Sequence, residues 1–500
     1  MSIRPTQRES TCGCDHGLDR RSFLGTMGAA AGAVSFTSFQ AADAAETESS
    51  SGDTKGATVR VVFLYPPSKQ FADDPNGWWS WPGNDYDAEN RQQQYMTALR
   101  EIEKKQGIKI VADPVRISTT GEAQQIADGL KDESPDGLLL IMFYNRSLGQ
   151  ADLLLKAAEQ LGIPTVFFIG LGVKHGQVAH YRRPGVYFIQ SLDNLDAIAY
   201  GVRMISAKKR LGQSKLLSIT EAREPREGTE RFFGIKVRVI PFDVYAEEFE
   251  RVKLGSEAAE WMAACQKGAT EKRGITDMAL ENAARAHFAL KKMLADEGAD
   301  GLTMNCLRRG MLKPCMSFAT LNGQLIPAAC ENDFGAMYTQ TIGQLLTGRP
   351  GFQHNPCFET EANHYYASHC TCPTNLHGPD GDKEDYLLRR FAHTNEGSCA
   401  IQVFWPEGEP VTMVHYYSAE VAKLDVYSGR VIKSHPMPPA AGCTTNVEIE
   451  ITDRSDACMV QGHHNLLFCG DFARKFRLFA NLMRLDLMEQ AEDRAAAPTV

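Results

Sequence analysis

Three short segments of the sequence carry side chains of the kinds that bind a metal ion and move protons. The first is the apolar, strand-like stretch from Leu321, which ends in Glu331 and Asp333. Reactive groups in α/β folds lie at the carboxyl ends of strands, so this position favours a functional role for Glu331. The alternative is a helix start, with Asp333 as the N-cap and Glu331 as a charge favoured by the helix dipole.

The second segment begins at Asn355 and adds Glu359, Glu361 and His364, with His369 five residues further on. On a strand, Glu359 and Glu361 would point to one face and His364 to the other. The alternative interpretation is a solvated strand face.

The third segment contains His463 and His464 ahead of an apolar run. Adjacent histidines on a strand point in opposite directions, so we expect at most one of them to reach a given metal ion. A satisfied core histidine is the alternative. Carboxylates combined with one imidazole suit Mn²⁺ or Mg²⁺ better than zinc. Such a site supports proton transfer next to a carbonyl group, because the metal polarises the oxygens and a carboxylate moves the proton.

The elements that must position these residues begin with a predicted α/β domain over residues 58–184. Its strands are apolar without polar alternation and are separated by helical stretches, which is typical of a parallel sheet covered on both faces. Ligands of such a doubly wound domain bind at the carboxyl ends of the strands. The predicted strands are Val59–Tyr65, Ile108–Ala112, Gly137–Tyr144 and Pro164–Gly170.

A second doubly wound α/β domain is predicted over residues 185–347, starting near Gly185. No G-x-G-x-x-G motif follows a strand and no P-loop is present, so the sequence does not support a nucleotide site. The predicted helices are Asn194–Leu211, Ala246–Lys267 and Asp277–Glu297, and the predicted strands are Lys215–Thr220, Val237–Val244 and Ala299–Met304.

Residues 348–490 are predicted to form a β-rich C-terminal domain, a small barrel or curled sheet, followed by a tail at 491–500. A final helix is expected over Phe472–Gln490. The predicted fold class is therefore α/β, with two doubly wound domains followed by a β-rich, small barrel-like domain. The short segments expected there are Cys357–Tyr366, Ser398–Trp405, Pro410–Ser418, Ala422–Tyr427, Gly429–Lys433 and Thr445–Ile451.

An aromatic loop follows the first strand and contains Trp78, Trp79 and Trp81. These side chains could form an apolar face for a sugar ring. They could equally pack on a neighbouring domain or subunit, since both roles use large amphipathic aromatics.

The N-terminal segment indicates export. Residues Asp19–Leu24 resemble a twin-arginine motif, and Ala42-Asp43-Ala44 fits a cleavage site after a mildly apolar stretch. We predict a signal over residues 1–44, a linker over 45–57 and a periplasmic or extracellular location. The signal takes Cys12 and Cys14 with it, and most of the 11 remaining cysteines are expected to be small, buried core residues.

Composition narrows the class of protein. The 500 residues include 53 Lys and Arg against 62 Asp and Glu, a formal net charge of −9, with no concentrated basic face. Nucleic-acid binding is therefore not expected. After the first 40 residues no apolar run reaches the ~18 residues of a membrane span, so we expect none in the mature chain. A soluble enzyme or a soluble binding protein remains.

Four stretches of the chain resemble the L-fucose isomerase family. The resemblance lies in the E-N-D context of Glu331 ahead of L-T-G, in the H-C-T strand and in two C-terminal stretches. The four stretches are Pro327–Pro350, Ala367–Pro373, Gly442–Ile451 and Gly462–Leu487. The resemblance implies two α/β domains, a β-rich domain and a Mn²⁺-dependent aldose–ketose isomerase. In that family a Glu, an Asp and a His hold the metal, and two carboxylates relay a proton through a cis-enediol.

The resemblance assigns Glu331 to the family glutamate and His464, or His463 after a one-residue slip, to the histidine. The family aspartate falls at Asn355, which can ligate a metal but cannot carry a proton. Either Glu359 or Glu361 substitutes for it, or the proton relay is broken.

The resemblance further implies a small-molecule sugar substrate and a homo-oligomer, a trimer or hexamer with shared active sites. By that analogy the tryptophan loop could complete a neighbour's pocket, and His369 is a further candidate substrate contact. The alternatives are a non-catalytic carbohydrate-binding protein and another metal-dependent enzyme acting on exported glycans, a lyase or an epimerase. The isomerase interpretation requires that Glu331 and His464 meet where the α/β and β-rich portions join.

Overall fold

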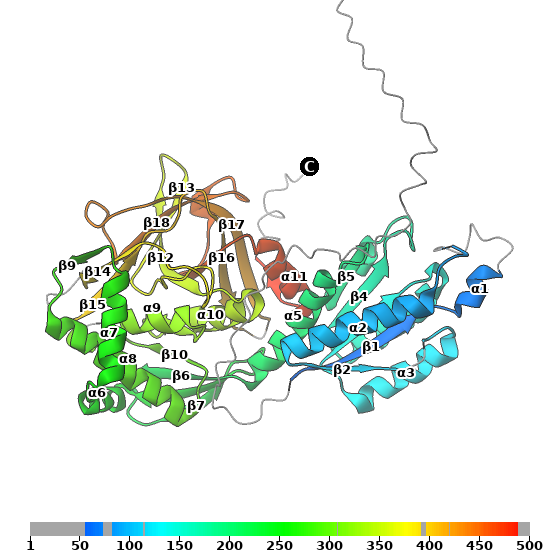
Figure 1. Ribbon diagram of the computed structural model, residues 1–500, viewed down its shortest axis with the longest axis horizontal. Helices are drawn as coiled ribbons and strands as arrows, with labels where there is room; N and C mark the ends of the chain where they lie inside the picture. The colour runs from blue at the N-terminus through cyan, green and yellow to red at the C-terminus, as the bar shows by residue number, and fades with distance from the viewer. Residues whose placement is uncertain are drawn as a thin grey trace, which may run out of the picture. The chain divides into compact units, whose positions relative to one another are not determined.

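The computed structural model shows a mixed α/β fold with parallel sheets and, in the C-terminal region, a closed six-stranded β-barrel (Figure 1). It describes residues 56–73, 83–113, 116–307, 309–391, 397–419 and 421–488. The predicted signal, nearly all of the linker, the loop of Trp78, Trp79 and Trp81, and the tail lie outside these residues. Within the described part of the chain, no helix combines the length and the apolar character needed to cross a membrane.

The first sheet has five parallel strands in the order β2-β1-β3-β4-β5. Helices cover both of its faces, and Figure 1 shows α2 and α3 on opposite sides of the strands. Leu139 and Ile141 of β3 pack with α2 and α5, whereas Leu138 and Leu140 pack with α3 and α4, which explains the continuous apolar run. The elements are β1 (Thr58–Leu64), α1 (Ser68–Ala72), α2 (Ala88–Gln106), β2 (Lys109–Ala112), α3 (Thr120–Glu133), β3 (Gly137–Met142), α4 (Leu148–Gln160), β4 (Thr165–Gly170), β5 (Val186–Ser191) and α5 (Leu195–Gln213).

The strand that follows Gly185 belongs to this first sheet. β5 pairs with β4 in parallel register from Thr165↔Val186 to Gly170↔Ser191. The chain therefore changes sheets after residue 191, not at the predicted boundary of 185. Apolar periodicity identifies a strand but does not identify the strand it pairs with, which is why the sequence misplaced this change.

The second sheet has the order β11-β10-β6-β8-β7, with β7 antiparallel to β8 and the other pairs parallel. The helix predicted over Ala246–Lys267 is two helices, because the chain leaves helical geometry at Val252 and restarts after Gly255. The elements are β6 (Lys215–Thr220), β7 (Arg226–Thr229), β8 (Lys236–Pro241), α6 (Phe242–Arg251), α7 (Ser256–Gly268), α8 (Asp277–Glu297), β10 (Gly301–Met304), α9 (Cys315–Gly323) and β11 (Ala328–Cys330).

The barrel closes through the strand order β16-β19-β12-β13-β18-β17, with β16 also pairing with β17. A three-stranded sheet, β15-β14-β9, is separate from it. The two segments predicted around Ser428 form one strand, β17, because Gly429 allows close approach to the carbonyl oxygen of Glu450. The elements are β9 (Glu271–Arg273), β12 (Gly351–Glu359), β13 (His364–His369), β14 (Tyr386–Arg390), β15 (Cys399–Val403), β16 (Pro410–Tyr417), β17 (Lys423–Ser434), β18 (Thr445–Ile451), β19 (Asn465–Cys469) and β20 (Asp486–Leu487).

Two helices connect these parts. α10 (Phe334–Thr347) is buried along most of its length and contacts β10 and β11 of the second sheet as well as β12, β16 and β19 of the barrel. A side chain at Gly343 would overlap the ring of Phe468, so this helix lies directly against the barrel. α11 (Ala473–Met483) contacts β5 and α5 of the first sheet. It ends earlier than predicted, at Arg484, which adopts a left-handed conformation with φ 63°.

Candidate metal centre

Glu331 lies directly after β11, at the carboxyl edge of the second sheet. Glu331 and Asn332 both have left-handed backbone conformations, with φ of 64° and 57°. The side chain of Asn332 accepts a hydrogen bond from the hydroxyl of Ser218 at 2.7 Å, and its N–H donates to the carbonyl oxygen of Met304 at 3.0 Å. These bonds hold a sharp turn between β11 and α10, and Glu331 lies on that turn. Non-glycine residues in this region store backbone strain that is common at functional sites.

Asp333 is the N-cap of α10 and also a partner of His464. Its Oδ1 accepts a hydrogen bond from the N–H of Ala336 at 2.7 Å, as the helix-start interpretation predicts. Its Oδ2 accepts a hydrogen bond from Nδ1 of His464 at 2.8 Å. The capping role and a role in the site are therefore compatible in one side chain. Glu331, in contrast, precedes the cap and does not lie in the first turn of the helix.

His464 meets Glu331 across 133 positions of the sequence. Its ring is 2% exposed, and its Nε2 lies 3.3 Å from Oε2 of Glu331. His463 also lies nearby, since a ligand atom from each of Glu331, His463 and His464 falls within 4.8 Å of the others. The expectation that only one of the two histidines could reach the centre is wrong. Both precede β19, and His464 has a φ of 59°, so strand alternation does not apply to them.

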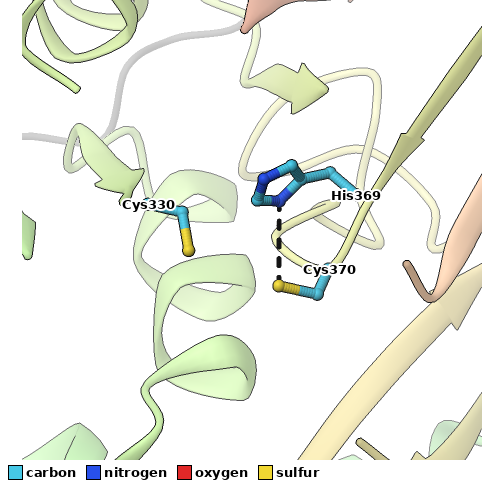
Figure 2. A group of neighbouring side chains, drawn as sticks. All are labelled: Cys330, His369 and Cys370. Carbon is cyan, nitrogen blue, oxygen red and sulfur yellow. Dashed lines mark hydrogen bonds between the residues drawn. The ribbon is translucent and has the colours of Figure 1, made fainter. Parts of the chain in front are cut away.

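His369, the last residue of β13, approaches Glu331 from another side. It is 1% exposed, and its Nε2 lies 3.6 Å from Oε1 of Glu331. Its Nδ1 faces the sulfur of Cys370 at 3.7 Å, the contact drawn in Figure 2. The rings of His369 and His464 are 5.3 Å apart and nearly perpendicular, so the Glu331 carboxylate lies between two imidazoles.

The charged groups of Glu331, Asp333 and His464 shift one another's pKa values. Contacts with His369 and then His464 hold the pKa of Glu331 well below its ordinary value, against the opposing effect of burial. Burial alone would lower the pKa of His464, but hydrogen bonds with Asp333 and Glu331 outweigh it and raise that pKa to about 9. Burial alone would raise the pKa of Asp333, yet the bonds from His464 and the Ala336 N–H leave it below its ordinary value. Without a metal ion, the carboxylates and imidazolium charge stabilise each other.

A cavity of about 760 Å³ opens beside this group. Glu331, Asn355, Glu359 and His369 line it, together with apolar side chains such as Phe358. Oδ1 of Asn355 is buried and has no hydrogen-bond partner among the described residues. An unpartnered buried oxygen is costly unless a ligand satisfies it.

Glu359 and Glu361 do not share a strand face, as the sequence had predicted. β12 ends at Glu359, and the chain turns before β13 begins at His364. Both residues are exposed, but Glu359 lines the cavity and Glu361 does not. The backbone N–H of Glu361 donates to Oε1 of Glu359 at 3.2 Å. His364 instead pairs with Glu448, at 2.7 Å from its Oε1.

The residues fit the divalent ion that the family resemblance implies. Two ligand atoms each ~2.1 Å from an ion and at right angles to it are ~3.0 Å apart, close to the 3.3 Å between Glu331 Oε2 and His464 Nε2. Nε2 of His464 is buried and lacks a hydrogen bond of good geometry, while its Nδ1 is oriented by Asp333. Carboxylate–histidine pairs of this kind orient metal ligands in many proteins. Asn355 lines the same cavity as Glu331 and offers an unpartnered buried oxygen there.

Sequence reasoning missed the cysteines of this region. Most of the cysteines are buried, as expected, but six of them also line the cavity. One signal was available in the sequence, because Cys330 precedes Glu331 and Cys370 follows His369. The six are Cys306, Cys315, Cys330, Cys357, Cys370 and Cys443.

Comparison with known proteins leaves the family open. No protein-family model matches the chain, and no curated protein sequence matches it significantly. The likeness to L-fucose isomerases therefore stays a hypothesis, and functional inference rests on the geometry of the site.

Proposed function

We propose that this protein is a metal-dependent enzyme that interconverts an aldose and a ketose by moving a proton between adjacent carbon atoms. The observation that carries the proposal is the convergence of the Glu331 carboxylate with Nε2 of His464, 3.3 Å away, beside a cavity of about 760 Å³. Cavities of ~300–1,000 Å³ are typical of small-molecule sites. A hexose or a smaller sugar would fit within this volume.

In this proposal Glu331, His464 and Asn355 hold the ion, Mn²⁺ or Mg²⁺. When bound, the ion supplies polarisation of the carbonyl and hydroxyl oxygens of the sugar. Asp333 fixes the ring of His464 by accepting the proton of Nδ1, which leaves Nε2 to face the ion. Nε2 of His369 lies 3.6 Å from Oε1 of Glu331 and Nε2 of His464 lies 3.3 Å from Oε2, so the carboxylate is placed between the two rings.

The proton relay needs a second carboxylate, because the amide of Asn355 cannot accept a proton. Glu359 is the better candidate of the two that the sequence offered, since it lines the cavity and Glu361 does not. In the proposed reaction the Glu359 carboxylate takes the proton from C2 of the aldose and returns it to C1, while the hydroxyl proton of O2 passes to O1, which leaves a carbonyl at C2 and a hydroxyl at C1. Glu331 stays ionised throughout, consistent with its lowered pKa.

A second candidate is a carbohydrate-binding protein without catalysis, and Asn355 favours it. An amide at that place preserves ligation and removes one acid–base group. A lyase or an epimerase acting on exported glycans would begin with the same proton abstraction, so product analysis distinguishes it from an isomerase.

The test is to load the full chain with Mn²⁺, incubate it with a panel of aldoses in D₂O and follow the products by NMR. An isomerase gives the matching ketose with deuterium incorporated at the exchanging carbon, and Glu331→Gln abolishes both signals. Sugar binding without exchange would establish the carbohydrate-binding alternative. An exchange product other than a ketose would establish the lyase or epimerase.

Three further parts of the proposal concern the whole protein. In this proposal the two five-stranded sheets belong to two doubly wound domains and the barrel to a β-rich C-terminal domain; the strands of the two five-stranded sheets and of the barrel are separate sets. The N-terminal 44 residues direct export to the periplasm or beyond by the twin-arginine route. The enzyme works as a homo-oligomer, a trimer or a hexamer, as the family resemblance implies.

A further inference from the structure

We infer that Cys330, Cys370 and His369 form a second metal site, distinct from the Glu331–His464 centre, that binds a thiolate-preferring ion such as Zn²⁺. Figure 2 shows the three side chains turned toward one another from the ends of β11 and β13. A ligand atom from each of the three lies within 4.8 Å of the other two. All three residues are at most 3% exposed, so the donors are nearly inaccessible to solvent although they line the cavity.

Further thiols surround this group. Sγ of Cys306 lies 2.7 Å from Sγ of Cys330, and Cys315 and Cys443 line the same cavity as Cys370. These cysteines come from separate segments: the end of β10, the start of α9, the ends of β11 and β13, and the loop before β18.

The donor set specifies the chemistry of the ion. Sulfur ligands select Zn²⁺, Cu⁺ or an iron–sulfur cluster over Mn²⁺ and Mg²⁺, and three thiolates with one histidine are a common structural zinc set. Cys306 is the nearest fourth ligand. Sulfurs bound to one tetrahedral zinc at ~2.3 Å stand ~3.8 Å apart, so Cys306 would retreat by ~1 Å from Cys330 on binding. The bound thiols would lose their protons to solvent.

The two ring nitrogens of His369 face different centres, one the proposed zinc site and the other the Glu331–His464 centre. Its Nδ1 faces Cys370 at 3.7 Å, while its Nε2 faces Oε1 of Glu331 at 3.6 Å. A histidine that ligates through one nitrogen usually donates its other N–H to a carboxylate. Glu331 is the carboxylate that faces this nitrogen, so the proposed zinc site would lie directly beside a ligand of the other centre.

The experiment uses the full chain, reduced, stripped with a chelator and titrated anaerobically with Co²⁺ as an optical probe for Zn²⁺. We expect a sulfur-to-cobalt charge-transfer absorption that saturates at one ion per chain and disappears when Zn²⁺ is added. The double variant Cys330→Ser/Cys370→Ser should lose the absorption. Cys372→Ala, which removes a fully buried thiol outside the cavity, should keep it.

His464→Gln separates this inference from the proposed function, because His464 belongs to the Glu331–His464 centre and is not a member of the Cys330–His369–Cys370 group. This variant removes a ligand of the first centre and should leave the cobalt–thiolate absorption in place, whether or not the protein is an isomerase. Wild-type protein that takes up Co²⁺ without sulfur-to-metal absorption would overturn the inference, and this result needs no variant to fold. A Cys306–Cys330 disulfide that, once reduced, yields thiols unable to take up Co²⁺ would overturn it as well.

Discussion

Nδ1 of His464 lies 2.8 Å from Oδ2 of Asp333, and the other oxygen of the same carboxylate caps helix α10. One side chain therefore starts the helix that lies between the second sheet and the barrel and orients an imidazole beside Glu331. The two roles can be separated by substitution, because asparagine caps helices about as well as aspartate does.

Asp333→Asn should retain the cap and weaken Mn²⁺ binding by about 10–100-fold, the usual effect of losing a carboxylate behind a metal-bound histidine. Asp333→Ala should weaken binding similarly and cost a further 0.5–2 kcal/mol of unfolding free energy (about 1 kcal/mol on average) through loss of the cap. Calorimetric Mn²⁺ titration and denaturant unfolding measure the two effects. Unchanged affinity in the Asn variant would show that Asp333 serves the helix only.

Glu359→Gln tests the second carboxylate of the proposed relay. We expect turnover to fall by about 100-fold or more, the typical contribution of a positioned acid or base, with little change in Mn²⁺ affinity. Glu361→Gln is the matched control, since Glu361 is exposed two positions away and does not line the cavity. Equal losses in the two variants, measured as initial rates on the active sugar, would contradict the role of Glu359.

Asn355→Asp should strengthen metal binding, because it adds a negative oxygen ligand where a buried amide oxygen has no partner. We expect Mn²⁺ affinity to rise by about tenfold, which corresponds to ~1.4 kcal/mol. Competition titration with a chelator of known affinity measures the change. A weaker affinity would indicate that Asn355 does not face the ion.

Gly343→Ala should destabilise the fold, because the added methyl group would overlap the ring of Phe468. Overpacking of this kind costs ~1–3 kcal/mol, more than the ~0.5–1 kcal/mol that alanine gains over glycine in a helix. Gly129→Ala in α3 is the control, since its methyl group would meet only a flexible carboxylate oxygen of Glu133 at 3.4 Å. We expect that variant to be more stable than wild type in thermal unfolding.

The buried side chain of His287 should make the free energy of unfolding depend on pH. Burial, assisted by Lys291, lowers its pKa to about 3. The unfolded chain therefore binds a proton that the folded chain excludes between the ordinary pKa of about 6.5 and about 3. Unfolding free energy should fall as pH drops through this window, by at most ~1.4 kcal/mol per pH unit from this residue. His287→Gln should reduce the slope in urea unfolding at several pH values, whereas exposed His175→Gln should not.

Much of the fold follows from the sequence because local patterns determine it. The helical stretch predicted over Asp277–Glu297 has the observed bounds of α8, and the short alternating segment predicted over Thr445–Ile451 has those of β18. The predictions failed where a distant contact decides the outcome. The partner of β5 and the continuity of β17 through Gly429 depend on neighbouring strands that no local window contains.

The site residues, like the fold, were predicted where local sequence sufficed and missed where the three-dimensional fold decides. Glu331 and His464 were predicted from their residue types and the family resemblance, and the structure brings them together. His463 was misjudged because the strand rule was applied to residues that precede the strand and turn through a left-handed conformation. The thiol group was missed because its members are dispersed from Cys306 to Cys443, and only the fold collects them.

The packing of α11 has a consequence for how the chain is made. The side chain of Asn481 donates to the carbonyl oxygens of Val186 and of Arg183, the latter 298 positions earlier in the chain, and its own carbonyl oxygen accepts from the N–H of Gly185. A ribosome releases the early strands long before it has made the helix that packs on them. For most of translation the surface of β5 that α11 later covers is therefore exposed to solvent. We expect a nascent-chain chaperone to bind this surface until α11 has emerged.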